Sequence, residues 1–408
     1  MNLAASLALP VIALTFIGVA AGEVPGFKMN RATIALVGAV ALVALQAIAP
    51  GAALAAIDPN TLLLLFAMMV ISVLLLLAGF FSWISQFIAR HTHSPRWLLA
   101  WIFLAAGVLA AFFLNDTVVV MFTPLVLEIT RTLRCNPLPY LIGLAAAANI
   151  GSTATITGNP QNMLIGLSSQ LSFAAFLGAL GPIALISLAL SWLIIMGFYR
   201  DEFRTPWPRE RLLVVTQIDR TLLIKSLILI VLMLIAFLAG APIPLTAIAV
   251  VAALLISRCI PPETIFARID WSLLIFVAGL FVVTGALEHT SILDRLFTLI
   301  APLIRSGVGP LAIVTAALSN LVSNVPSVLL FRSVVPHLAD PNQAWLTLAT
   351  ASTLAGNLTS LGSVANLIVV EIARADGVKI SFFEYLKVGV PLTIITLIVG
   401  IVWLSVVA

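Results

Sequence analysis

The sequence predicts an all-α integral membrane protein, an inverted repeat with five transmembrane helices, one re-entrant hairpin and one broken helix at the membrane midplane in each half. Of the 408 residues, 62% are hydrophobic and 9% are charged, against about 25% charged in soluble proteins. Apolar runs such as Leu62–Phe81 approach the ~20 residues that cross a bilayer as a helix. Polar residues recur at one spacing in both halves: Asp116 and Asn149 are 33 residues apart, and so are Asn324 and Asn357.

The distribution of Lys and Arg predicts the orientation of the chain. The apolar stretch Leu3–Ala21 lacks the basic segment that precedes a cleavable leader, so we interpret it as the first transmembrane helix, with its N-terminus outside. Lys28 and Arg31 follow it and should be cytoplasmic. Three later loops carry no Lys or Arg and should lie outside, namely 50–60, 168–170 and 240–244. The alternation predicts a multi-pass protein of the inner (cytoplasmic) membrane.

A charged segment divides the chain into two halves. Residues 1–200 are expected to form the first inverted repeat, and residues 221–408 the second. Residues 201–220 contain Pro206, Pro208 and several charged side chains, and we interpret them as a cytoplasmic linker. Since the first half begins outside and the second begins inside, the two repeats should be inverted relative to each other.

Each half contains a pair of apolar arms that predicts a hairpin. The first hairpin covers 97–131, with Asn115-Asp116-Thr117 at its tip. Its second arm is only about 14 residues, roughly 21 Å of helix, which is short of a full crossing. The second hairpin covers 308–335, with Ser323-Asn324-Val325 at its tip.

A helix that stops halfway is predicted after each hairpin. The first broken helix covers 138–167 and the second covers 344–370. Gly158 and Pro160 interrupt the first, and Pro disfavours a helix interior by about 3 kcal/mol. Broken helices at corresponding positions of two halves indicate a transporter binding site, because freed carbonyl groups can coordinate a cation and the new helix N-termini can face an anion.

The polar residues of the hairpin tips and helix breaks are the predicted substrate and ion site. Amide and hydroxyl groups supply both donors and acceptors for oxyacids or dehydrated cations. Asp116 is the one carboxylate at a hairpin tip and the expected proton carrier, because burial favours the neutral carboxyl group. The predicted site residues are Asn115, Asp116, Thr117, Asn149, Ser152, Thr153, Asn159, Gln161, Asn162, Ser323, Asn324, Asn357, Thr359, Ser360, Ser363 and Asn366.

Two further readings of these residues follow from their chemistry. Asn, Ser and Thr can also hold membrane helices together by interhelical hydrogen bonds without touching a ligand. A polar site without a deeply buried Arg or Lys favours an uncharged or cationic substrate, although helix dipoles alone can hold an anion.

The segments 115–124 (NDTVVVMFTP) and 157–166 (TGNPQNMLIG) resemble the ion transporter superfamily, most closely its arsenite permease and sodium–proton antiporter branch with the anion-permease-like members. The resemblance covers nearly the whole chain and includes Ser323-Asn324 and the segment from Asn357 to Asn366. It implies an elevator-type fold, in which hairpins and broken helices move against a scaffold, and a homodimer. Asn115-Asp116 resembles the arsenite permeases, whereas related dicarboxylate transporters carry Ser-Asn-Thr at both tips.

These features predict a secondary active transporter, with proton-coupled efflux of arsenite or antimonite as the first hypothesis. A Na⁺- or H⁺-coupled anion or dicarboxylate symporter, a Na⁺/H⁺ antiporter and a passive channel are the alternatives. The expected partners are a small inorganic or small-anion substrate, protons or Na⁺, the lipid bilayer and, for an arsenite permease, a soluble ATPase.

Other classes of protein are not expected. The net charge of +4 comes from loop residues and indicates orientation, not nucleic-acid binding. The two cysteines, Cys135 and Cys259, are too few for a disulfide framework. The sequence has no zinc-protease, nucleophile-elbow or P-loop motif, so we expect no enzyme activity, no cofactor and no metal centre.

Overall fold

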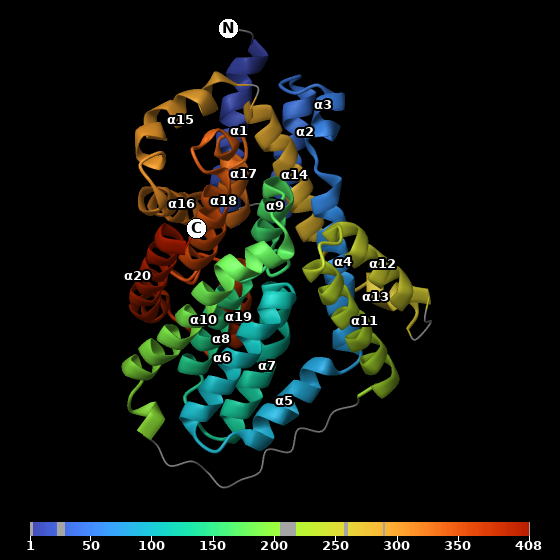
Figure 1. Ribbon diagram of the computed structural model, residues 1–408, viewed down its shortest axis with the longest axis vertical. Helices are drawn as coiled ribbons and strands as arrows, with labels where there is room; N and C mark the ends of the chain where they lie inside the picture. Colours follow the sequence, from blue (N-terminus) through green and yellow to red (C-terminus); the bar gives the residue numbers. More distant parts are fainter. Residues whose placement is uncertain (1–2, 23–28, 205–217, 257–259, 289, 408) are drawn as a thin grey trace.

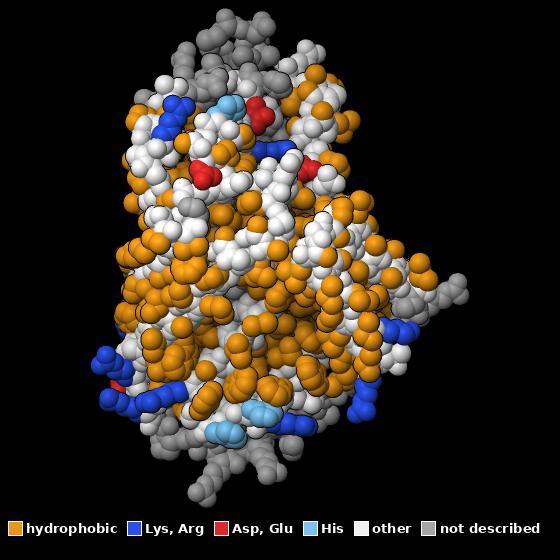
Figure 2. Space-filling model, in the orientation of Figure 1, with side chains coloured by type: hydrophobic (Ala, Val, Ile, Leu, Met, Phe, Trp, Pro, Cys, Tyr) orange, Lys and Arg blue, Asp and Glu red, His pale blue; other side chains and the backbone are white. Residues whose placement is uncertain are grey.

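The computed structural model describes residues 3–22, 29–204, 218–256, 260–288 and 290–407, and the regular elements in these ranges are helices (Figure 1). Among the described residues, six helices are long and apolar enough to cross a membrane. Figure 2 shows a broad band of hydrophobic side chains across one face of the molecule, with charged side chains gathered above and below this band. The predicted all-α membrane fold is confirmed. Lys28, Cys259 and linker residues 205–217 lie outside the described residues.

The helices of the two halves follow the same order. The first half contains α1 (Leu3–Ala21), α2 (Arg31–Ala44), α3 (Pro50–Ala56), α4 (Pro59–Leu77), α5 (Phe80–His91), α6 (Pro95–Phe112), α7 (Asn115–Thr132), α8 (Leu138–Ser152), α9 (Pro160–Ser169), α10 (Phe173–Phe198) and the short η1 (Glu202–Arg204). The second half contains α11 (Arg220–Leu238), α12 (Ile243–Ile256), α13 (Pro262–Phe266), α14 (Trp271–Glu288), α15 (Ser291–Ile304), α16 (Val308–Val322), α17 (Asn324–Phe331), η2 (Val335–His337), α18 (Pro341–Ala355), α19 (Val364–Ala375) and α20 (Phe382–Val407).

Corresponding helices make corresponding contacts across the two halves. Helix α2 packs against α14, and α12 packs against α4; α7 packs against α19, and α17 packs against α9. Within each half, α6 lies on α8 and α16 lies on α18. This reciprocal packing brings the hairpins α6–α7 and α16–α17 to the broken helices α8–α9 and α18–α19 near the middle of the molecule (Figure 1).

The first hairpin differs in detail from the expectation. Its second arm, α7, has 18 residues and begins at Asn115, so the tip is formed by Phe113 and Leu114. Asn115, Asp116 and Thr117 form the first turn of α7 instead of the tip. This placement is physically favourable, because the first turn of a helix has free N–H groups and attracts negative charge.

The short helices α3 and α13 were not anticipated from the sequence, and neither were the longer α5 and α15. Gly79 has the left-handed conformation, with φ of 78°, and separates α4 from α5 within the predicted apolar run Leu62–Phe81. Helix α5 then runs in a different direction from α4 (Figure 1). Figure 1 shows α5 and its counterpart α15 at opposite ends of the molecule. Each precedes a hairpin and contacts its first arm, α6 or α16.

Candidate functional site

The two helix breaks are closed by similar local structures. Asn159 caps α9, where its Oδ1 accepts the Asn162 N–H at 2.8 Å and Pro160 occupies the first position. Ser363 caps α19, and its Oγ accepts the Asn366 N–H at 3.2 Å. Asn, Ser and an N-terminal Pro are the residues that helix starts prefer. The restart of each helix is therefore specified locally by its own sequence.

Gly158 allows the first break to meet the first hairpin. Its carbonyl accepts the Asn115 N–H at 3.0 Å. A Cβ at Gly158 would lie 2.4 Å from Ser152 O and 2.8 Å from Ala110 O, so no larger residue fits without moving backbone. The position of α7, and with it Asp116, is thus tied directly to the break between α8 and α9.

Asn149, in the last turn of α8, joins both halves in one buried network. Its Nδ2 donates to Asn357 Oδ1 at 2.8 Å and to Asn366 Oδ1 at 2.9 Å. Its Oδ1 accepts from Asn115 Nδ2 at 3.2 Å and from Ser363 Oγ at 3.1 Å. All four bonds of which this amide is capable are therefore made. They link a hairpin and two broken helices that lie far apart in the sequence.

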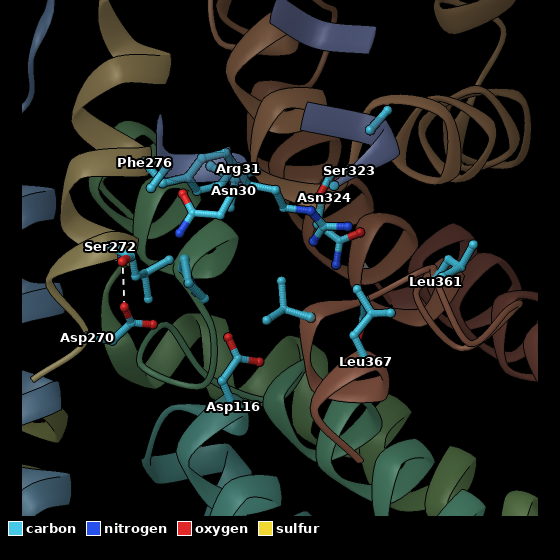
Figure 3. A pocket seen from close by; sticks show the side chains of 18 of the residues that line it. Asn30, Arg31, Asp116, Asp270, Ser272, Phe276, Ser323, Asn324, Leu361 and Leu367 are labelled. Carbon is cyan, nitrogen blue, oxygen red and sulfur yellow. Dashed lines mark hydrogen bonds between the residues drawn. The ribbon is translucent and has the colours of Figure 1, made fainter. Parts of the chain in front are cut away.

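A pocket of about 600 Å³ lies beside this network, between the two hairpins, the two breaks, and helices α1, α2 and α14 (Figure 3). Among the described residues, six helices begin at its wall: α2, α7, α9, α14, α17 and α19. Each helix N-terminus carries roughly half a positive charge and free N–H groups. The pocket wall is therefore suited to oxygen-rich solutes.

Charged side chains also face the pocket. Asp116, Asp270 and Glu371 line it, and Arg31 is the basic residue among its described lining. Figure 3 shows Asp116 and Asp270 pointing into the same space, while Arg31 extends from α2 toward Ser323 and Asn324. The pocket is therefore lined by three carboxylates on the negative side and by one guanidinium and six helix N-termini on the positive side. Because each helix N-terminus carries about half a positive charge, the total positive and negative charges are of similar size.

A half-buried basic side chain, Arg31, lines the pocket in addition to the polar residues that the sequence singled out. Arg31 was assigned to a cytoplasmic loop by charge counting, but it is the first residue of α2, after the cap Asn30, and lines the pocket. Asp270 was also missed; it stands just before α14, where its Oδ1 accepts the Leu273 N–H at 3.2 Å. A signal existed for Arg31, because a basic residue in a first turn opposes the helix dipole and needs a reason.

The predicted site residues divide into two groups. Six of them line the pocket: Asn115, Asp116, Gln161, Ser323, Asn324 and Ser363. The others lie outside its lining: Asn149, Ser152, Thr153, Asn159, Asn162, Asn357 and Asn366 are buried behind it, Ser360 is buried in the second break, and Thr117 and Thr359 are half-buried. The first group faces the solute space, and two of its members, Asn115 and Ser363, connect it to the buried network around Asn149.

A multi-pass helical membrane protein with a charged pocket between two hairpins and two broken helices is the architecture of a membrane transporter. Comparison with known families agrees, because the model of the citrate transporter family (CitMHS) matches residues 16–355. The chain belongs to this family, so it is a transporter and not an enzyme, and the resemblance to the ion transporter superfamily is confirmed.

Curated relatives extend over nearly the whole chain. The silicon efflux transporter LSI3 of Oryza sativa subsp. japonica is 30% identical, covering 93% of each chain. A 46 kDa membrane protein of Mycobacterium leprae is 29% identical, covering 97% of this chain and 98% of that one. A Dictyostelium discoideum protein named as transporter arsB is 24% identical, covering 91% of this chain and 87% of that one.

A solved structure shares the fold. The YdaH transporter of Alcanivorax borkumensis superposes with a TM-score of 0.56 at 13% identity, covering 99% of this chain and 98% of that one. At this level of identity the likeness concerns the arrangement of the helices alone.

Proposed function

We propose that the chain exports a small, uncharged, hydroxyl-rich oxoacid, such as arsenous, antimonous or silicic acid, in exchange for protons. The observation that carries this proposal is the position of Asp116, at the N-terminus of α7 and inside the pocket where helix N-termini meet. The names of two relatives, a silicon efflux transporter and a protein named arsB, fit this class of solute.

Exchange follows from competition for one carboxylate. Ionised Asp116 accepts hydrogen bonds from the hydroxyls of a neutral oxoacid, whereas protonated Asp116 loses part of that capacity. Proton and solute would therefore occupy the site alternately. Among the lining residues, Gln161, Asn324 and Ser363 supply further donors and acceptors for the hydroxyl groups.

The proposal includes an elevator movement in the inner membrane, with the N-terminus outside. Arg31 and Asp270 come from α2 and the start of α14, whereas Asp116, Gln161 and Asn324 come from the hairpins and broken helices. A pocket shared between two such groups would be carried to the other side if the hairpins and broken helices moved against α2 and α14.

The test is uptake of arsenite and of silicic acid into everted membrane vesicles with an acid interior. Wild-type vesicles should accumulate one of these solutes only while the proton gradient lasts. Asp116→Asn should abolish gradient-driven accumulation, because the amide imitates the protonated carboxyl group. Asp340→Asn, a change at the cap of α18 away from the pocket, serves as the control. Full proton-driven accumulation by Asp116→Asn would refute the mechanism.

A second candidate, coupled transport of a carboxylate anion, is favoured by Arg31 and by the family description. Arg31→Gln separates the two. Loss of a hydrogen bond from the charged guanidinium costs about 1.5–3 kcal/mol, roughly 10- to 150-fold in affinity, and an anionic substrate would in addition lose its ion pair with Arg31. The measurement is uptake of citrate or a dicarboxylate, with and without Na⁺, into the same vesicles. If the substrate is an anion, Arg31→Gln should reduce this uptake more than it reduces the uptake of arsenite or silicic acid.

A further inference from the structure

Basic side chains gather where α5 ends and α6 begins, at the end of the molecule opposite α15 (Figure 1). The sequence contains no Asp or Glu between Asp58 and Asp116, so the surrounding chain supplies no carboxylate to neutralise them. Four basic residues fall within the window 90–96, and all four side chains are exposed: Arg90, His91, His93 and Arg96. These four residues are called the basic elbow below.

The two arginines of the basic elbow are available to a ligand. Among the described residues, neither Arg90 nor Arg96 forms an ion pair. The short η1 packs against α6 and brings Glu202 to it, but the Glu202 carboxylate accepts the Asn136 N–H and the Tyr140 hydroxyl. A guanidinium group presents its N–H donors in a fork that matches the oxygens of a phosphate group. The unpaired arginines therefore suit a phosphate.

The fold also orients the imidazole of His91. Its Nδ1 lies 2.8 Å from Phe87 O, one turn earlier in α5, and because a carbonyl oxygen only accepts, Nδ1 carries the proton and donates it. The His91 ring packs on the Phe87 ring with 4.1 Å between the centroids. Phe87 in turn meets Trp101 edge-on, with 5.3 Å between the centroids. The second imidazole nitrogen, Nε2, is thus the one left for a ligand.

Exposed aromatic side chains lie next to the basic elbow. Trp83 and Phe87 on α5 and Trp97 on α6 are exposed to 47%, 41% and 58%. The other face of α5, with Phe81 and Ile88, is buried against the protein. Figure 2 shows histidine and basic side chains directly below the hydrophobic band. A helix with exposed aromatic and basic residues at the edge of such a band is typical of the boundary between lipid chains and headgroups.

The corresponding elbow at the other end of the molecule differs in charge. It joins α15 to α16, and the matching window, 303–309, contains one basic residue, Arg305. The two elbows occupy the same place in their halves, so the geometry of the connection does not require four basic residues. An excess of positive charge at one end matches a membrane whose anionic lipids are concentrated in one leaflet.

We propose that the basic elbow binds the headgroup of an anionic phospholipid, whose acyl chains lie along the exposed aromatic side chains of α5 and α6. The two guanidinium groups donate to the phosphate oxygens, and His91 adds a donor at Nε2 when its ring is protonated. A soluble phosphate would gain nothing from the aromatic surface. Helix α5 contacts α4 as well as α6 and α7, so the bound lipid would hold the connection between α4 and the first hairpin at the membrane surface.

The experiment measures thermal unfolding of the purified full chain in a nonionic detergent. Phosphatidylglycerol, phosphatidylcholine or glycerol phosphate is added at equal phosphate concentration. Phosphatidylglycerol should raise the unfolding temperature by about 2 °C or more over phosphatidylcholine, because a ligand that binds the folded state stabilises it. Glycerol phosphate should give little or no increase. About 1 M NaCl should reduce the difference between the two lipids, because salt screens exposed charges.

Variants assign the effect to the basic elbow. Arg90→Gln/Arg96→Gln should lose at least about half of the increase produced by phosphatidylglycerol, since both guanidinium donors are gone. Arg374→Gln/Lys379→Gln is the matched control, because it removes the same exposed charge next to the acidic Asp376, and it should keep the full increase. Arg96→Gln alone decides the matter if the double variant does not fold.

Three results would overturn the proposal: equal stabilisation by the two lipids, full stabilisation of the variants of the basic elbow, or an equal loss in the control variant. Stabilisation by glycerol phosphate as large as that by phosphatidylglycerol would identify a soluble phosphate as the ligand and would overturn it too. None of these readouts involves transport, so they are independent of the vesicle experiment on Asp116.

Discussion

The two helix breaks are built from the same parts but differ in exposure and charge. Residues 149–166 of the first break are buried throughout, whereas the second break exposes Leu361 to 60%. The second arm of the first hairpin starts with Asn115-Asp116, and that of the second starts with Asn324-Val325. The first break is therefore a closed frame beside Asp116, and the second is a more exposed surface whose resumed helix, α19, brings Glu371 to the pocket. The two halves therefore share an arrangement of helices but contribute differently to the pocket.

The largest expected difference between the breaks concerns Asn149 and Ser352, which occupy the same place, three residues before the end of α8 or α18. Asn149→Ala would remove four hydrogen bonds between segments and leave buried partners unpaired, at a cost of about 2–4 kcal/mol. Among the described residues, Ser352 Oγ bonds within its own helix, to Leu348 O at 2.6 Å, so Ser352→Ala should cost under about 1 kcal/mol.

Thermal unfolding in detergent measures both effects. Equal destabilisation by the two substitutions would show that Asn149 does not hold the halves together. It would contradict the proposed difference between the first and the second break.

An intermediate effect is expected at the glycines of the breaks. Gly158→Ala would place a Cβ 2.4 Å from Ser152 O and 2.8 Å from Ala110 O. It should cost about 3 kcal/mol, because both contacts are with helix backbone, which cannot move aside easily. Gly362→Ala, at the corresponding position before the cap Ser363, would place a Cβ 2.7 Å from Gly356 O and should cost less, about 2 kcal/mol. Folded yield and unfolding temperature report the order, and a reversed order would contradict the view of the first break as the tighter frame.

The smallest expected effect leaves stability nearly unchanged and concerns access. In a protein with Cys135 and Cys259 replaced by Ser, Leu361→Cys should react with a water-soluble maleimide at least about ten times faster than Ile156→Cys, since Ile156 is fully buried. A substrate that fills the pocket should slow labelling at position 361. Comparable rates at the two positions would mean that both breaks open.

Local features of the fold were predictable because they depend on local chemistry. The hairpins, the broken helices and the polar residues of both breaks follow from apolar run length, Gly, Pro and capping residues, and these signals lie within a few positions of the structure that they specify. In the structure the two interrupted helices are α8–α9, over 138–169, and α18–α19, over 341–375.

Long-range features were not predictable in the same way. Arg31 and Asp270 reach the pocket because α2 packs against α14, a contact between distant segments of the chain. The positive-inside rule, in contrast, assigns every Lys and Arg to a cytoplasmic loop and so leaves no basic residue for a binding site. The equal spacing of 33 residues also misled. Asn149 lies inside α8 whereas Asn357 follows the end of α18, and the residues with matching bonds are Asn162 and Asn366.

Helix α2 packs against α14, and α4 packs against α12. During synthesis, α2 and α4 are therefore complete well before the helices against which they pack. The partners of α2 and α4 emerge from the ribosome roughly 170–230 residues later, which is about 10–40 s at ordinary translation rates. Until then the first helices must remain in the lipid without the neighbours that cover them in the finished protein. Lipid or an insertion chaperone has to cover the faces that pack later, which are rich in Ala and Gly in α2 and in Leu and Met in α4. Cells that lack such a chaperone should therefore accumulate less of this protein than of one whose helices pair in chain order.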